Sequence, residues 1–356
     1  MMTPDFERIR KTVRHEEPDR VPLCEVLIEY PVQSRFLGRE VTPDDLEAQV
    51  AFWAGAGYDA FPLPVSMMTP GKVTDESPIS RAIRDVMAND RERADDTSWN
   101  LEYTGFINDR ADFERFPWEL AAELDFGPMN NIGRLLPDGM KVIAVSGKIF
   151  TLTWMLMGFN AFALSLIEDE RLVADIFRRI AEIQFRALGT IFEMPHVGAV
   201  WVVDDIAGNT GPLISPGALR DHVFPWYRDM ARICHEHGML FFMHSDGDLT
   251  KVMEDIIGLG VDVLQPIDPT CMDIVQVKER YGDRISIVGN VSNELLQTGT
   301  PAEVEATVKT LIQNLAPGGG YCVGSGNSVP SWAAFENFQA MREATFRYGG
   351  YPIITT

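Results

Sequence analysis

Residues 199–244 read AVWVVDDIAGNTGPLISPGALRDHVFPWYRDMARICHEHGMLFFMH, and this one segment outlines a strand, a helix and a second strand. Apolar and β-branched residues predict buried strands at Ala199–Asp204 and Leu240–His244. Between them, apolar residues recur every three or four positions from Pro216 to His237, which predicts one amphipathic helix. A strand, a helix and a strand in this order form the unit from which parallel α/β sheets are built.

Residues with strong positional preferences mark the ends of that helix. Ser215 is a favoured capping residue and Pro216 suits the first turn, whereas Gly238 suits the position just past the end. A longer helix with the same apolar periodicity is predicted from Glu170 to Glu193.

The same alternation of short apolar runs and helical patterns extends along the chain. Six further strands are predicted, at Val21–Leu27, Tyr58–Leu63, Lys141–Ser146, Val261–Gln265, Ile285–Val288 and Tyr321–Val323. Eight strands alternating with helices predict an α/β protein, a (β/α)8 TIM barrel, in one domain over residues 1–356. Such a barrel needs about 250 residues, so we expect an amino-terminal helical extension and a lid-like insertion at Ser66–Gly139, between strands two and three. A doubly wound sheet is the alternative, but no Gly-x-Gly-x-x-Gly follows the first strand.

The composition limits the classes of partner. The chain has 356 residues, of which 46% are hydrophobic and 23% charged, so it can bury a large core. Its formal net charge of −21 repels phosphate backbones and anionic lipids. We therefore expect a small-molecule substrate, and neither a nucleic acid nor a membrane surface as partner.

The cysteines and the amino terminus indicate the compartment. Cys24, Cys234, Cys271 and Cys322 are scattered without a Cys-x-x-Cys pair, which is typical of a reducing environment. Residues 1–20 are charged and lack the apolar run of a signal peptide. No stretch approaches the ~20 apolar residues of a membrane span. The sequence predicts a cytoplasmic protein.

Polar residues gather where the predicted strands end, which is where TIM-barrel enzymes place their reactive groups. The candidate catalytic residues are His244, Asp246, Asp204, Asp205 and Glu25. The candidate substrate-binding residues are Ser146, Lys148, Trp154, Asn290 and Asn327. We predict that His244, Asp246, Asp204 and Asn327 share one pocket.

Each of these residues also has an ordinary structural interpretation. His244 and Asp246 suit a metal pair, or a general base with its orienting carboxylate, but such a histidine can also simply bind backbone. Asp204 and Asp205 suit a substrate-binding or proton-handling pair; alternatively, Asp205 caps the next helix or turn and only Asp204 faces the barrel. Trp154 belongs to an apolar cluster that suits either a pocket for a flat ligand or the core of a helix.

Several motifs, taken in order, resemble the uroporphyrinogen decarboxylase superfamily. They are EEPDRVP (16–22), DDIAGNTGPLISPGALRDHVFPWY (204–227), HEHGMLFFMHSDGDL (235–249), GVDVLQPI (260–267), IVGNVS (287–292) and SGNSVP (325–330). The resemblance covers nearly the whole chain and implies a TIM barrel with its active site at the carboxyl ends of the strands. The superfamily includes uroporphyrinogen decarboxylases and cobalamin-linked methyltransferases.

The decarboxylase branch fits this chain poorly. Its arginine-rich loop after the first strand corresponds here to CEVLIEYPVQSRF (24–36), which has apolar residues near the arginine positions. Its histidine after strand eight corresponds to Asn327. The acidic residues at the strand ends would repel a substrate with eight carboxylates. We therefore reject uroporphyrinogen as the substrate.

The methyltransferase branch fits better. Its zinc-dependent members use His-x-Cys after strand five and a cysteine after strand eight, where this chain has His244-Ser245-Asp246 and Asn327. The resemblance implies that His244 and Asp246 hold zinc, with Asn327, Glu25 or water completing the ligand set. Oxygen ligands would make the ion a harder Lewis acid, suited to polarising a methyl-ether oxygen. The resemblance also implies transfer of the methyl group to a corrinoid supplied by a partner protein, because the chain shows no cobalamin-binding module.

Other functions stay open at the level of sequence. A metal-free decarboxylase of a small or tetrapyrrole-like acid could use His244 as proton donor and Lys148, Arg35 or Arg220 as carboxylate anchors. A non-catalytic binding barrel is the third interpretation. The identity of the methyl donor and the formation of a homodimer also stay open.

Overall fold

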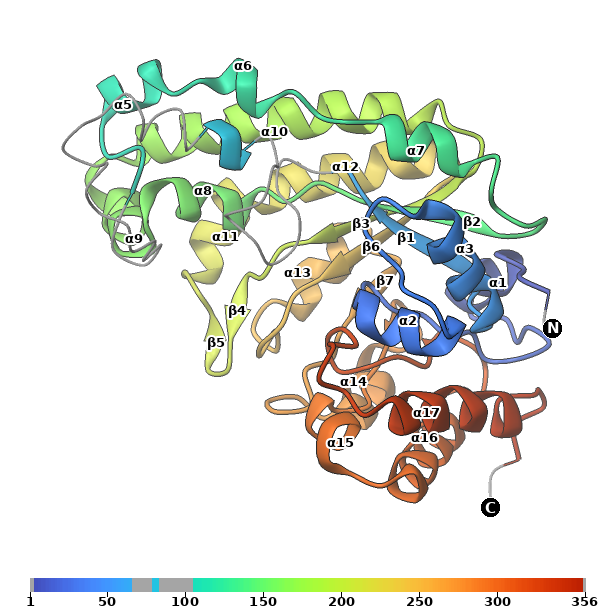
Figure 1. Cartoon of the computed structure of the whole chain (residues 1–356). Coiled ribbons are helices and arrows are strands. Elements are labelled where there is room, and N and C mark those ends of the chain that lie inside the picture. Colours follow the sequence, from blue (N-terminus) through green and yellow to red (C-terminus); the bar gives the residue numbers. More distant parts are fainter. Residues whose placement is uncertain (1–2, 66–78, 83–104, 355–356) are drawn as a thin grey trace.

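A curled sheet of seven parallel strands forms the centre of the molecule (Figure 1). The computed structural model describes residues 3–65, 79–82 and 105–354. The strands of the sheet are β1 (Ala60–Pro64), β2 (Lys141–Val145), β3 (Val197–Val203), β6 (Leu240–His244), β7 (Val263–Gln265), β8 (Ser286–Val288) and β9 (Tyr321–Cys322). They pair in this order, so all their carboxyl ends lie at one edge of the sheet.

The first predicted strand, Val21–Leu27, is not a regular strand. Its pairing with the chain near β9 consists of isolated parallel bridges, from Leu23 to Val323 and from Ile28 to Val329. Pro22, just before the first bridge, has no N–H, so it cannot donate to a ladder at that end of the segment. Among the described residues, no backbone pairing joins this segment to β1. The predicted eight-stranded barrel is therefore found as a seven-stranded curled sheet with an eighth, bridged segment.

Side chains, rather than a backbone ladder, connect that segment to the start of β1. Asp59 is fully buried and accepts hydrogen bonds from Arg8 at 2.7 Å and from Arg20 at 3.0 Å. Arg20 also donates to the carbonyl of Gly57 at 3.1 Å. A carboxylate removed from water needs such partners. This ion cluster lies at the amino ends of the strands, at the edge opposite to the candidate site residues.

Helices pack around the sheet (Figure 1). α12 (Phe224–Glu236) packs on β6 and on α10 (Glu170–Phe192), while α16 (Pro301–Leu315) and α17 (Phe335–Tyr348) pack against each other at the far end. A short hairpin, β4 (Ala207–Gly208) with β5 (Gly211–Pro212), projects after β3. The other helices are α1 (Glu7–Val13), α2 (Tyr30–Leu37), α3 (Leu46–Gly55), α5 (Arg110–Arg115), α6 (Trp118–Ala121), α7 (Gly127–Ile132), α8 (Phe150–Met157), α9 (Phe159–Glu168), α11 (Pro216–His222), α13 (Met253–Gly258), α14 (Ile274–Tyr281) and α15 (Asn293–Thr298).

Two helix predictions have different outcomes. The helix predicted over Glu170–Glu193 is confirmed as α10, which ends one residue earlier. The helix predicted over Pro216–His237 is wrong as a single element, because α11 and α12 are separated at Val223. Pro225, in the first turn of α12, has no N–H, so a continuous ladder of hydrogen bonds is not available there.

Much of the predicted insertion Ser66–Gly139 lies outside the described residues, including the charged stretch DRERADDTSWNLEY at 90–103. The described part of it, from 105 onward, is fastened to α10 by ion pairs. Arg110 contacts Asp175 at 2.6 Å, and Glu119 contacts Arg179 at 2.9 Å.

The apolar cluster after β2 forms part of the core. Phe150 and Leu156 of α8 are fully buried, and the partly buried ring of Trp154 meets the ring of Phe159 edge-on at 5.8 Å. Within the described residues no single helix has both the length and the apolarity to cross a bilayer. α8 and α9 meet those criteria only jointly, as a pair bent by 98°.

Candidate active site

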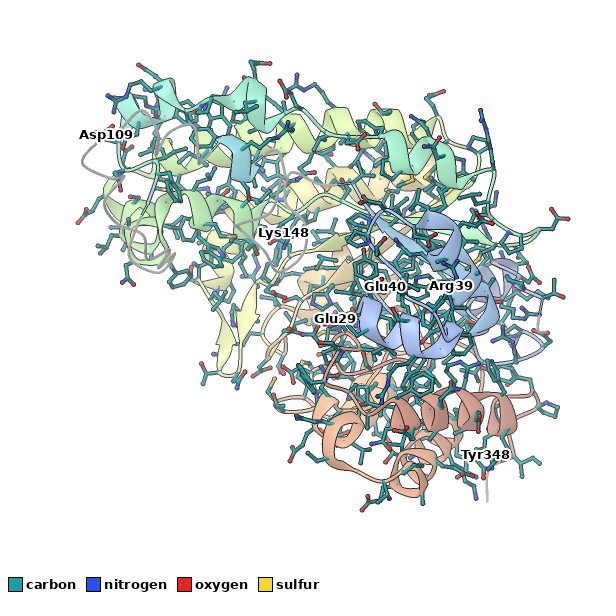
Figure 2. All side chains as sticks on the ribbon, viewed as in Figure 1. Glu29, Arg39, Glu40, Asp109, Lys148 and Tyr348 are labelled. Carbon is teal, nitrogen blue, oxygen red and sulfur yellow. The ribbon has the colours of Figure 1, made fainter. Side chains whose placement is uncertain are left out.

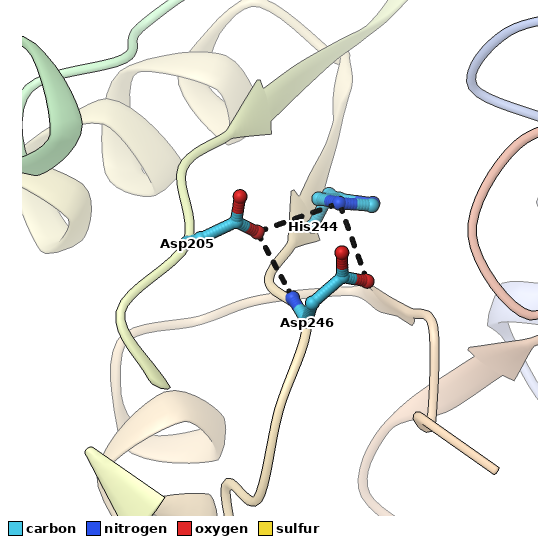
Figure 3. Close-up of side chains that lie close together, drawn as sticks. All are labelled: Asp205, His244 and Asp246. Atoms are coloured by element: carbon cyan, nitrogen blue, oxygen red, sulfur yellow. Dashed lines mark hydrogen bonds and ion pairs between the residues drawn. The ribbon is translucent and has the colours of Figure 1, made fainter. Parts of the chain in front are cut away.

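Three side chains meet at the carboxyl ends of β3 and β6: Asp205, His244 and Asp246 (Figure 3). His244 Nε2 lies 3.5 Å from Asp205 Oδ1 and 3.8 Å from Asp246 Oδ1. The imidazole is buried, whereas the two carboxylates are 49% and 34% exposed. The histidine therefore forms the floor of the site, and the carboxylates form its open side.

Backbone contacts hold the two carboxylates together. The N–H of Asp246 donates to Asp205 Oδ1 at 3.0 Å. The next residue, Gly247, has a φ of +91°, and a Cβ at this position would lie 2.7 Å from the carbonyl carbon of Ala207. Glycine therefore allows the loop after β6 to lie directly against the hairpin after β3.

The surroundings of Asp246 make it unusual for an aspartate. Its Oδ2 accepts a hydrogen bond from Asn327 Nδ2, while its Oδ1 is buried and has no hydrogen-bond partner among the described residues. Burial raises the pKa of Asp246 to about 6; His244 opposes this shift, and Asp205 and Asp268 add to it. A buried acceptor without a partner is costly and rare, and at a functional site it suggests a ligand.

Gln265, which was not among the predicted site residues, contacts His244 directly. His244 Nδ1 lies 2.6 Å from Gln265 Oε1, and Gln265 Nε2 donates to the carbonyl of Asn327 at 2.6 Å. Gln265 is the last residue of β7 and pairs with His244 in the sheet register. Like His244, Gln265 is the last residue of a predicted strand, and this position in the sequence could have indicated it as a site residue.

The two neighbouring aspartates have opposite orientations. Asp204 is fully buried, and its carboxylate accepts four hydrogen bonds, from the N–H groups of Ile149, Phe150 and Thr151 at 2.6–2.7 Å and from the hydroxyl of Tyr227 at 2.6 Å. It thus binds the first turn of α8, where helix N–H groups lack partners. The interpretation in which Asp205 caps a helix and Asp204 faces the barrel is wrong. Asp204 binds the start of a helix, and Asp205 faces His244. The carboxylate of Asp204 does not belong to the predicted pocket.

Glu25 anchors the loop that carries Asn327. It is 2% exposed and accepts hydrogen bonds from the N–H and the hydroxyl of Ser325, at 2.6 and 2.7 Å. Burial raises the pKa of Glu25 to about 8, although the bonds from Ser325 oppose the shift. Its described contacts are therefore with the loop after β9 and not with His244.

Two candidate substrate-binding residues make structural hydrogen bonds. The hydroxyl of Ser146 donates to Gln184 of α10 at 3.3 Å, on the outer side of the sheet. The side chain of Asn290 donates to the carbonyl of Ile267 at 2.9 Å and ties two neighbouring loops together.

The candidate carboxylate anchors differ in their availability. Arg220 is occupied, because both its Nε and its Nη2 bind Asp255 at 2.8 Å. Arg35 lies over the ring of Phe335, at 5.8 Å from its centroid. Lys148 is half-buried in the loop after β2 (Figure 2) and remains the candidate anchor.

The donor set of the site suits a divalent cation. One imidazole nitrogen and two carboxylate oxygens, one each from His244, Asp205 and Asp246, lie within 4.8 Å of one another. Nitrogen and oxygen ligands of this kind suit zinc and harder divalent ions. Asn327, predicted as a ligand, turns its NH2 group toward Asp246, and Asp205 supplies the third donor instead.

The parallel α/β sheet, with a polar site at the carboxyl ends of its strands, defines a barrel-type enzyme scaffold. A family model described as uroporphyrinogen decarboxylase (URO-D) matches residues 129–348, and the chain belongs to this family. The resemblance stated from the sequence motifs is thus confirmed.

Comparison with solved structures supports the fold. A methyltransferase from Methanosarcina mazei matches with 17% identity and a TM-score of 0.67, over 96% of this chain and 98% of that one. Dispersin B matches with 11% identity and a TM-score of only 0.33, over 59% of this chain and 73% of that one. No curated protein matches the chain.

Proposed function

We propose that this protein is a cation-dependent methyltransferase, which takes a methyl group from a small donor such as a methyl ether and passes it to a corrinoid on a partner protein. The observation that carries the proposal is the free Asp246 Oδ1 beside His244 Nε2 and Asp205 Oδ1. Two carboxylate oxygens beside the same ring nitrogen repel each other unless a proton or a cation lies between them.

The charge of the site also favours this substrate class over a carboxylic acid. Asp205 and Asp268 both lie near Asp246. Arg220 of α11, a candidate anchor for a substrate carboxylate, is already paired with Asp255. Negative charges at a few ångströms oppose the binding of an anionic substrate. A methyl ether carries no such charge.

The residues of the chain would divide the work as follows. His244, Asp205 and Asp246 would hold the cation, which supplies Lewis acidity toward the departing oxygen when bound. Asn327 holds Asp246 in place, and Glu25 holds the loop that carries Asn327. An alkyl ether is a poor leaving group at neutral pH, so its oxygen needs such polarisation or a proton as the methyl group leaves.

The proposal is tested by cation binding and by methyl transfer in the same preparations. We expect the wild type, purified without chelator, to bind one equivalent of Zn²⁺ or a similar divalent ion, and His244→Ala and Asp205→Asn to lose it. Incubation with a panel of methyl ethers and free cob(I)alamin should convert its absorption spectrum to that of methylcobalamin. Strong chelators should stop this conversion.

A second histidine–carboxylate pair provides the matched control. His235, near the carboxyl end of α12, has its Nε2 atom 2.9 Å from Asp262 Oδ2. Within the described residues this pair has no third potential metal ligand close by. His235→Ala should leave both cation binding and methyl transfer unchanged. Substoichiometric metal in the wild type, or carbon dioxide release from a carboxylic acid with chelators present, would contradict the proposal.

A further inference from the structure

Three hydrogen bonds link His244, Gln265, Asn327 and Asp246 around the candidate site. His244 Nδ1 contacts Gln265 Oε1, Gln265 Nε2 donates to the carbonyl of Asn327, and Asn327 Nδ2 donates to Asp246 Oδ2. The second oxygen of Asp246 then lies 3.8 Å from His244 Nε2. His244 is 3% exposed and Gln265 is fully buried, so water does not replace these contacts.

The carbonyl of Asn327 fixes the orientation of the Gln265 amide. A carbonyl oxygen only accepts hydrogen bonds, so the group 2.6 Å from it must be the amide NH2. The amide oxygen is then the atom that faces His244 Nδ1, also at 2.6 Å. Since that oxygen only accepts, Nδ1 must carry the proton.

This assignment determines what the other ring nitrogen can do. In the neutral imidazole a proton on Nδ1 leaves a lone pair on Nε2, which faces Asp205 and Asp246. Without the amide, the opposite tautomer would be favoured here, because a proton on Nε2 could be shared with either carboxylate. The local carboxylates and Gln265 thus favour different tautomers.

We infer that Gln265 is a positioning residue: it holds the proton of His244 on Nδ1 and so keeps the Nε2 lone pair available to a cation. Its consequence for cation binding rests on the proposed function, but the position of the proton does not. Outer hydrogen bonds of this kind typically change metal affinity by about 10–100-fold.

The experiment measures the tautomer in metal-free protein without substrate. Long-range ¹H–¹⁵N spectra of histidine-labelled protein, at a pH where the ring is neutral, distinguish the nitrogen that carries the proton from the bare one. The His244 signals are identified by their loss in His244→Ala. We expect Nδ1–H in the wild type and a shift to Nε2–H in Gln265→Leu, with Zn²⁺ binding weaker by about 10–100-fold in the latter.

Two further variants separate positioning from general damage. Gln265→Met keeps a side chain of similar length but removes the amide, and should also move the proton to Nε2. Gln184→Leu removes another buried glutamine, which bridges Ser146 and the carbonyl of Lys148, and should leave the His244 tautomer unchanged.

The outcomes are distinguishable from a failure of the proposed function. Nε2–H in the wild type, or Nδ1–H persisting in Gln265→Leu, would overturn the role of Gln265 whatever the protein catalyses. A wild type with Nδ1–H that binds no Zn²⁺ would support the positioning role and contradict the cation-dependent mechanism. If Gln265→Leu does not fold, Gln265→Met takes its place, and Nδ1–H persisting in that variant would overturn the role of Gln265.

Discussion

At the scale of single residues, hydrogen-bond partners distinguish side chains that are available for chemistry from side chains that hold the structure together. Asp204 and Asp205 are adjacent and identical, yet one carboxylate binds a helix terminus and the other faces His244. Glu25 is acidic and buried, but its contacts assign it to the support of a loop. Residue type alone could not have separated these roles.

The raised pKa of Glu25 predicts how stability varies with pH. Between its ordinary value of 4.5 and about 8, the unfolded chain loses the proton while the folded chain retains it. The free energy of unfolding therefore falls as pH rises through this window, and levels off above about 8. Glu25→Gln cannot ionise, so its stability relative to the wild type should increase across the window, by on the order of a few kcal/mol.

Urea unfolding of both proteins at the two ends of the window measures this difference. The amide can accept from the N–H of Ser325 and donate to its hydroxyl, so the local structure should persist. Parallel pH profiles for the two proteins would mean that Glu25 is ionised in the folded state.

At the scale of elements, short signals at helix ends were the most dependable part of the sequence. Ser215 accepts from the N–H of Ala218 at 3.1 Å at the start of α11, and Gly238 has a φ of +69° just after α12, both as predicted. These signals act locally and need no knowledge of the rest of the fold. The break at Val223 was missed because apolar periodicity continues across it.

A capping box at the start of α16 gives an element-scale prediction. Thr300 Oγ1 accepts from the N–H of Glu303, whose carboxylate accepts from the N–H of Thr300 at 2.7 Å. Thr300→Ala should lower the free energy of unfolding by about 1 kcal/mol. Thr310→Ala is the control on the same helix, since that hydroxyl only bonds the carbonyl of Ala306. Equal losses in the two variants, measured by urea unfolding, would argue against the cap.

The candidate site was predictable in part, for a physical reason. His244 and Asp246 stand at a strand end, and the rule that parallel strands align their carboxyl ends places them correctly. Gln265 occupies an equivalent position, but its role follows from the partners of its two amide atoms, His244 Nδ1 and the carbonyl of Asn327, which meet it only in the folded chain. The direction of Asp204 depends on where the first turn of α8 arrives in space, which no local pattern encodes.

At the scale of the whole molecule, the curled sheet depends on side chains where its ladder is incomplete. The segment around Leu23 pairs by bridges on one side, and on the other it connects to the start of β1 through Arg20 and Asp59. The alternation of apolar runs predicted the order of the strands. It could not predict that the first of the eight segments would pair by isolated bridges on one side and through a buried ion cluster on the other.

This cluster should therefore contribute strongly to stability. Asp59→Ala leaves Arg20, which is 8% exposed, without its carboxylate, and we expect a loss of about 3–5 kcal/mol in urea unfolding. Asp19 binds the same Arg8 at 2.6 Å, but its side chain is 64% exposed. Asp19→Ala should lose no more than about 1 kcal/mol. Similar losses of unfolding free energy in both variants would show that the contribution of these carboxylates to stability does not depend on their burial.

The single peptide bond between Asp204 and Asp205 links the seating of α8 to the geometry of the candidate site. Asp204 accepts hydrogen bonds from the first turn of α8, and the next residue, Asp205, faces His244. We therefore expect a displacement of α8 to move the carboxylate of Asp205 as well. A one-residue insertion or deletion between strand β3 and this pair would leave an aspartate at only one of the two positions. A design that grafts Asp205, His244 and Asp246 onto another barrel should therefore include α8, because the contact of α8 with Asp204 fixes the position of the neighbouring Asp205.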